Sequence, residues 1–134
     1  MSARILIVDD DATICLLLSD ILKVLGYTPI SVQTCAEGIA FLEEHDPPDL
    51  VLLDLALPDG VGWVVHSAMQ EVPAWSRIPT IIVTGNLTNV PPDVSWTPGQ
   101  LTCLEKPFSV KRLKRTIAEN LAAQQVRVPA EQVA

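Results

Sequence analysis

Short apolar runs alternate along the chain with segments in which apolar residues recur at helical spacing. Short β-rich runs at residues 4–8, 27–32, 50–53, 80–83 and 101–104 predict strands, and the continuous apolar run at 4–8 is typical of a strand buried on both faces. Helical spacing predicts helices over residues 12–25, 34–45, 62–71 and 109–123. Strands that alternate with helices indicate an α/β domain, in which helices cover both faces of a parallel sheet.

Local signals support these boundaries. Gly26 stands where a helix cap is expected, and Thr34 with Glu37 has the spacing of a capping box at a helix start. Pro29 favours an edge position for its strand, because proline has no backbone amide hydrogen to donate to a neighbouring strand. Residues 58–60, Pro-Asp-Gly, predict a turn.

The segment between the fourth and fifth predicted strands breaks the pattern. Pro91, Pro92 and Pro98 fall within it, and an interior proline costs a helix about 3 kcal/mol. We therefore expect residues 86–98 to form a loop, or one short turn that starts at Pro91. Trp96 either covers the core there or binds a partner, and its large ring favours the first role.

Composition narrows the classes of protein that the chain can be. Its 134 residues, 49% of them hydrophobic, predict one domain over residues 1–125 with a flexible tail at 126–134. A net charge of −7 argues against a nucleic-acid partner. No apolar run is long enough for a membrane helix, and no signal segment is visible. Three cysteines without metal spacing favour reduced thiols and a cytoplasmic location.

Polar residues follow the predicted strands at the edge where parallel α/β sheets bind ligands. Asp9 and Asp10 follow the first strand, Asp54 the third, Thr84 the fourth and Lys106 the fifth. Clustered carboxylates need a cation, and oxygen ligands suit Mg²⁺, with Mn²⁺ also possible. With a lysine and a hydroxyl beside it, an aspartate there can accept a phosphoryl group.

Taken together, these motifs resemble the response-regulator receiver domains of two-component signalling, over residues 3–123. The matching stretches are residues 5–11 (ILIVDDD), 49–58 (DLVLLDLALP) with Gly62, 82–85 (IVTG) and 106–108 (KPF). The resemblance implies a flavodoxin-like, doubly wound sheet of five parallel strands in the order 2-1-3-4-5.

The resemblance also implies a role for each matched residue. Asp54 is the expected phosphoacceptor, and Asp9, Asp10, Asp54 and the backbone carbonyl of Ala56 are the expected Mg²⁺ ligands. Thr84 and Lys106 are expected to contact the phosphoryl oxygens. The peptide bond between Lys106 and the following proline is expected to be cis.

Two features depart from the family. Where many receivers have an aromatic residue three positions before the lysine, this chain has Cys103, which cannot swing a ring between buried and exposed states. Where the family has its fourth helix, this chain has the proline-rich segment 86–98. Both departures touch the same surface, so we expect an unusual output face.

We expect a stand-alone receiver that is phosphorylated by a histidine kinase or a histidine phosphotransfer protein. Its output would be binding to a downstream protein or onward phosphotransfer, as a monomer or weak dimer. Beyond its own phosphorylation and dephosphorylation we expect no enzyme activity, since Ala56 stands where aspartyl phosphohydrolases need a second aspartate. The alternative is a pseudo-receiver, which keeps the fold and binds partners independently of phosphate.

Overall fold

The centre of the molecule is a sheet of five parallel strands: β1 (Arg4–Val8), β2 (Thr28–Val32), β3 (Leu50–Leu53), β6 (Thr80–Thr84) and β7 (Leu101–Glu105). The computed structural model describes the backbone of residues 2–85, 87 and 90–133, and the side chains through residue 124. The strand order is β2-β1-β3-β6-β7, which confirms the predicted topology. Pro29 lies in β2, an edge strand, as predicted.

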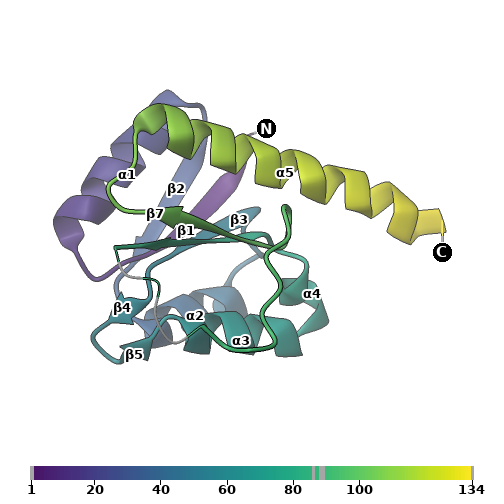
Figure 1. Ribbon diagram of the computed structural model, residues 1–134, viewed down its shortest axis with the longest axis horizontal. Helices are drawn as coiled ribbons and strands as arrows, with labels where there is room; N and C mark the ends of the chain where they lie inside the picture. Colours follow the sequence, from purple (N-terminus) through teal and green to yellow (C-terminus); the bar gives the residue numbers. More distant parts are fainter. Residues whose placement is uncertain (1, 86, 88–89, 134) are drawn as a thin grey trace.

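Helices cover both faces of this sheet (Figure 1). They are α1 (Ala12–Val24), α2 (Cys35–Glu44), α3 (Trp63–Glu71), α4 (Pro73–Ser76) and α5 (Val110–Val133). Helices α1 and α5 lie on one side, and α2, α3 and α4 lie on the other (Figure 1). The molecule is therefore the doubly wound sandwich that the alternation of strands and helices predicts.

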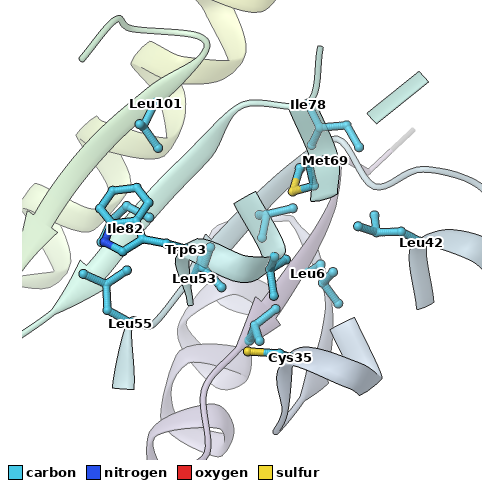
Figure 2. Close-up of a cluster of buried hydrophobic side chains, with 13 residues drawn as sticks. Leu6, Cys35, Leu42, Leu53, Leu55, Trp63, Met69, Ile78, Ile82 and Leu101 are labelled. Atoms are coloured by element: carbon cyan, nitrogen blue, oxygen red, sulfur yellow. The ribbon is translucent and has the colours of Figure 1, made fainter. Parts of the chain in front are cut away.

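Side chains alternate between two cores along each strand. Ile5 and Ile7 of β1 join the core under α1 and α5, whereas Leu6 and Val8 join the core under α2 and α3, part of which Figure 2 shows. All four are at most 1% exposed. Because both faces are covered, the strands read as continuous apolar runs rather than as alternating ones.

The predicted helix starts are confirmed. The Asp11 carboxylate accepts hydrogen bonds from the amides of Thr13 (2.9 Å) and Ile14 (3.3 Å) at the start of α1. The Thr34 hydroxyl accepts from the Glu37 amide (3.0 Å), and the Glu37 carboxylate accepts from the Gln33 amide (2.9 Å). Both caps satisfy amides that have no partner inside the helix.

Two small elements were not predicted. A hairpin of β4 (Ala56–Leu57) and β5 (Gly60–Val61) surrounds the predicted turn, and the short α4 follows α3. Two-residue strands are too short to leave an alternating pattern. Pro73 begins α4 at a position where its missing amide costs nothing, although proline read from sequence alone indicates a helix end.

The last helix is longer than predicted. The sequence prediction ended it near residue 123 and placed a loose tail from residue 126, but α5 continues to Val133 and extends past the sheet (Figure 1). That ending was wrong, and the sequence offers no local reason for the continuation, because Pro129 lies within it and an interior proline disfavours a helix. The domain boundary at 125 and the flexibility of the tail stay predictions, and residue 134 lies outside the described residues.

The connecting segment, residues 85–100 between β6 and β7, contains no helix among its described residues 85, 87 and 90–100. This confirms the predicted loss of a helix there, with residues 86, 88 and 89 lying outside the described part. The amide of Val94 donates to the carbonyl of Pro91 (3.2 Å), which is the short turn that the prolines predicted. Thr97 then forms an isolated bridge with Leu101.

Side-chain contacts on two sides help to hold the connecting segment to the domain, in addition to the bond from the Thr80 amide to the Gln100 carbonyl (2.9 Å). The Trp96 ring packs edge-on against the buried Trp63 ring, at 6.2 Å between centroids, and Trp96 stays 42% exposed. On the other side, the buried Asn120 of α5 accepts from the Gly99 amide (2.9 Å) and donates to Thr102 (3.0 Å). Trp96 thus covers part of the core, as favoured, and remains accessible on its outer face.

Candidate functional site

Three carboxylates and one ammonium group meet at the carboxyl edge of the sheet. Asp9 follows β1, Asp54 follows β3, and Lys106 follows β7. Oxygen atoms of Asp9, Asp10 and Asp54 lie within 4.8 Å of one another. We call these three aspartates and Lys106 the acidic rim. The structure therefore brings together the predicted metal-binding carboxylates and the predicted lysine.

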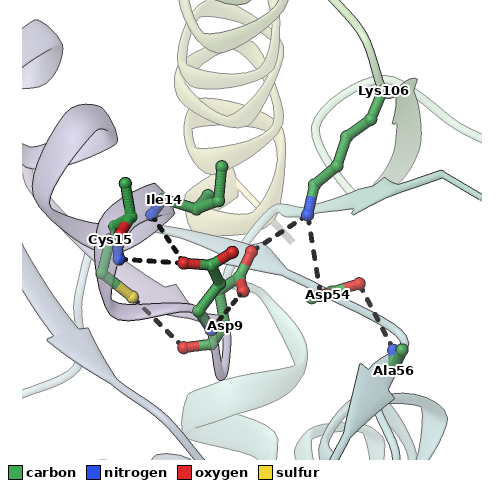
Figure 3. Close-up of polar contacts among 8 residues, drawn as sticks. Asp9, Ile14, Cys15, Asp54, Ala56 and Lys106 are labelled. Atoms are coloured by element: carbon green, nitrogen blue, oxygen red, sulfur yellow. Dashed lines mark hydrogen bonds and ion pairs between the residues drawn. The ribbon is translucent and has the colours of Figure 1, made fainter.

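Lys106 lies between two of the carboxylates (Figure 3). Its Nζ is 3.1 Å from Asp9 Oδ2 and 3.7 Å from Asp54 Oδ2. The sequence placed Lys106 beside the phosphoryl group but gave no sign of the pairing with Asp9. Lys106 carries a single positive charge, so it neutralises only part of the charge of the three aspartates.

Backbone amides fix the buried carboxylates in place. Asp9 is 2% exposed, and its Oδ1 accepts from the Asp11 amide at 2.9 Å. Asp54 is 7% exposed, and its Oδ1 accepts from the Ala56 amide at 3.3 Å (Figure 3). Each carboxylate thus has one oxygen held by the backbone and the other directed to Lys106.

Burial and neighbouring charges determine the pKa values of Asp54 and Lys106. Burial raises the pKa of Asp54, and Lys106 and the Ala56 amide oppose this rise without cancelling it. Burial alone would lower the pKa of Lys106, but its hydrogen bond with Asp9 and the charge of Asp54 outweigh that effect and raise it. Lys106 therefore remains an ammonium group at neutral pH, and a cation at the rim would favour the ionised form of Asp54.

Thr84 is buried at the end of β6, the strand between those of Asp54 and Lys106. The Lys106 amide donates to the Thr84 carbonyl at 2.8 Å, so the two backbones are joined. Ala56 contacts Asp54 through its amide, and its carbonyl as a metal ligand stays a prediction. The Lys106–Pro107 peptide bond is cis, as the resemblance implied.

Gly62 allows the chain to pass close beneath Asp54. A Cβ at this position would collide with the Asp54 backbone carbonyl and approach Leu55 Cα at 3.0 Å. The Gly62 amide also donates to the Leu55 carbonyl at 2.8 Å. The sequence motif included this glycine, and the close approach is the physical reason for it.

Two supporting aspartates were missed by the sequence reasoning. Asp59 in the hairpin turn accepts from the amides of Cys35 (2.8 Å) and Ala36 (3.0 Å), which anchors the turn to the start of α2. Asp11 caps α1 and positions Asp9. For Asp11 the signal was present, because an acid directly before a helical run is a common cap. Nothing local to Asp59 indicated its distant partner.

Cys103 packs in β7 beside Ile82 of β6. Burial raises the pKa of its thiol, Glu105 adds to the rise, and Arg112 opposes it. The thiol is therefore protonated at neutral pH, which favours the simple packing role over a redox role.

The residues of the rim fit a hard divalent cation. All the available donors are carboxylate oxygens, which Mg²⁺ prefers, and at least two of the carboxylates are buried where their mutual repulsion is poorly screened. Lys106 alone leaves a net negative charge. The donor set and its charge thus suit Mg²⁺ bound by carboxylates, with positions left for water and a phosphoryl oxygen.

Comparison with known proteins agrees with this fold. The model of the response regulator receiver domain family matches residues 5–118. The chain therefore belongs to the response regulator receiver domains of two-component systems.

Curated relatives match this chain over different shares of their own length. The chain is 30% identical over 129 residues to the transcriptional regulatory protein KdpE of Mycobacterium tuberculosis, covering 93% of this chain and 55% of that protein. It is 29% identical over 121 residues to the polar-differentiation response regulator DivK of Brucella ovis, covering 90% of this chain and 98% of DivK. The chain thus spans about half the length of the first relative and nearly all of the second.

A solved structure shows the same fold. The receiver domain of a sensor histidine kinase from Pseudomonas aeruginosa PAO1 superposes with a TM-score of 0.78 at 23% identity, covering 91% of this chain and 99% of that one. That structure has a magnesium ion coordinated in its active-site cleft. Within the described part of the present chain, no helix is long and apolar enough to span a membrane.

Proposed function

We propose that this receiver accepts a phosphoryl group on Asp54 and that Mg²⁺, bound by Asp9, Asp10 and Asp54, assists the transfer. The observation that carries the proposal is the acidic rim itself, in which a buried Asp54 faces Lys106 at 3.7 Å within a cluster of carboxylates. Packing alone gives no reason to bury such a cluster.

In the proposed reaction, a carboxylate oxygen of Asp54 attacks the phosphorus atom of a phosphohistidine. A phosphorus–oxygen bond to Asp54 forms as the phosphorus–nitrogen bond breaks, and the leaving imidazole takes up a proton. Bound Mg²⁺ would supply neutralisation of the charge on the phosphoryl oxygens.

The residues of the chain do the rest by position and charge. The Ala56 amide holds Asp54 Oδ1, which fixes the orientation of the carboxylate. Lys106 is protonated and directed into the rim, where it can contact a phosphoryl oxygen as Asp54 is esterified. Thr84 supplies a hydroxyl donor from the end of the neighbouring strand. The carbonyl of Ala56 is the proposed further metal ligand.

The physiological donor is proposed to be a histidine kinase or a histidine phosphotransfer protein, as for receivers generally. The output is proposed to be binding to a downstream protein or onward phosphotransfer. The chain would catalyse its own phosphorylation and dephosphorylation and no other reaction.

Intact mass spectrometry tests this function. The chain is incubated with acetyl phosphate and Mg²⁺, alongside Asp54→Asn and the control Asp46→Asn, which changes an exposed aspartate far from the rim. A gain of one phosphoryl group in the native chain and in Asp46→Asn, but not in Asp54→Asn or with chelator, is expected. No gain with either acetyl phosphate or a phosphorylated histidine phosphotransfer protein would favour the pseudo-receiver alternative.

A further inference from the structure

A cavity of about 620 Å³ lies beside the connecting segment, away from the acidic rim. One wall is α3, with His66, Ser67, Gln70 and Glu71, and the short α4 adds Ser76. The opposite wall is the connecting segment and the start of β7, which contribute Pro91, Asp93, Val94, Ser95, Gln100 and Leu101. The volume is typical of sites that bind ligands.

The cavity exists because the connecting segment is not a helix. Its described residues form an irregular strap with one turn after Pro91 and a second at residues 98–100, and a space remains between this strap and α3. The segment is held by Trp96 on Trp63, by Gly99 on Asn120, and by the bond from the Thr80 amide to the Gln100 carbonyl. The space is thus bounded on both sides by anchored parts of the chain.

The lining of the cavity is acidic. Glu71 and Asp93 stand on opposite walls, and no lysine or arginine is among the lining residues. Burial lowers the pKa of His66, and the charge of Asp93 opposes this only in part, so the imidazole is neutral at pH 7. Gln70, Ser67 and Gln100 add hydrogen-bonding groups, while Pro91, Val94 and Leu101 add apolar surface.

We propose that this cavity binds an arginine-containing peptide segment of a partner protein, with a guanidinium group between Glu71 and Asp93. Complementary charge selects the cation, and guanidinium offers five donors to the carboxylates and amides of the lining. Both acids are exposed, and an exposed ion pair by itself contributes little to affinity. A peptide that also fills the volume is therefore favoured over a free amine.

This inference goes beyond phosphoryl acceptance, and its measurement needs no phosphodonor. The probe is a blocked seven-residue peptide with two arginines in an alanine–serine background. Its matched partner has glutamine in place of both arginines, and free agmatine tests a small cation. Binding is followed by amide chemical shifts, which report where each probe binds, and the affinity is taken from the titration.

Saturable binding of the arginine peptide is expected, with shifts concentrated at Gln70, Ser76, Asp93 and Gln100. The glutamine peptide and agmatine are expected to bind at least about threefold more weakly, and raised salt should weaken the arginine peptide. The double variant Glu71→Gln with Asp93→Asn should lose about three- to tenfold in affinity. Glu44→Gln, which removes an exposed acid on α2, should match the native chain.

A steric variant separates shape from charge. Ser67→Phe places a ring in the cavity from an exposed position of α3 and should reduce peptide binding, whereas Val64→Phe on the same helix, outside the lining, should not. Circular dichroism confirms that each variant is folded.

Several results would overturn the proposal. They are no saturable shift at the lining residues, equal binding of the arginine and glutamine peptides, or agmatine binding as tight as the peptide. Self-association of the chain that Asp93→Asn abolishes would assign the cavity to a second copy and would also overturn it.

Discussion

The acidic rim lies at the carboxyl edge of the sheet, whereas the connecting segment runs from that edge, at the end of β6, back to the start of β7, and the two are built in different ways. Asp9, Asp54 and Lys106 follow strands, so the register of the sheet fixes where their side chains meet. The connecting segment lies outside the sheet and is held by scattered tertiary contacts, among them Trp96 on Trp63 and Gly99 on Asn120. A site placed by strands can be found from sequence spacing, whereas a loop placed by distant contacts cannot.

Gly62 tests how tightly the rim is built. Gly62→Ala should lower the free energy of unfolding by about 3 kcal/mol or more, because a Cβ there collides with the Asp54 carbonyl, which is rigid backbone. Urea denaturation measures the loss.

Gly85→Ala is the matched control for that variant. Apart from its chain neighbours, no atom of the described residues lies within 4 Å of a Cβ at Gly85, the first residue of the connecting segment, so the stability of this variant should change by less than about 0.5 kcal/mol. Equal losses in the two variants would show that the rim is no more tightly packed than the connection.

Asn120 tests how strongly the connecting segment is held. Asn120→Ala should cost about 2 kcal/mol, since it leaves the Gly99 amide without its partner and removes the bonds to Thr102 and to the Thr116 carbonyl (2.8 Å). Hydrogen exchange at Gly99 should accelerate in this variant. The neighbouring exposed position supplies the control, Glu119→Ala, and protection of Gly99 that survived Asn120→Ala would contradict this account.

The sheet could be predicted almost completely from the sequence, because its inner strands β1, β3 and β6 are buried on both faces and read as apolar runs, and helices separate the edge strands from them. The same reasoning located the rim, since parallel strands end at one edge. It could not find Asp59, whose partners on α2 are more than twenty residues away. Nor could it place the cavity, whose walls meet only through tertiary contacts.

The contact between Trp96 and Trp63 is a smaller part of the connection. Trp96→Ala should cost about 1 kcal/mol, the usual contribution of an edge-on aromatic pair, because the ring is 42% exposed and buries limited area. Trp96→Phe should retain most of that energy. A loss above roughly 3 kcal/mol in urea denaturation would instead mark Trp96 as a core residue.

Replacing Asp54 should have a smaller effect than the variants above and should raise the stability of the fold rather than lower it. Burial raises the pKa of Asp54 above its usual 3.8, so its ionised form costs the folded state stability once the pH is above the folded pKa. Toward pH 3, below the usual pKa of 3.8, the carboxyl is mostly protonated in both states and the cost fades. Asp54→Asn should therefore raise the melting temperature at pH 7 in chelator and leave it unchanged at pH 3.

Excess Mg²⁺ should reduce or reverse that gain, since the native chain would then be stabilised by a bound cation that the Asp54→Asn variant binds less well. Asp46→Asn serves as the control at both pH values. A gain in melting temperature that persisted undiminished at pH 3, or that was unaffected by Mg²⁺, would contradict the assignment of the rim as a cation site.

The most direct measurement identifies the residue that carries the phosphoryl group. The chain is phosphorylated in Mg²⁺, treated with borohydride to reduce an aspartyl phosphate to homoserine, digested, and sequenced by tandem mass spectrometry. The account predicts homoserine at position 54 and at no other aspartate. Homoserine at position 9 or 10, or phosphate retained on a serine, threonine or histidine, would contradict it.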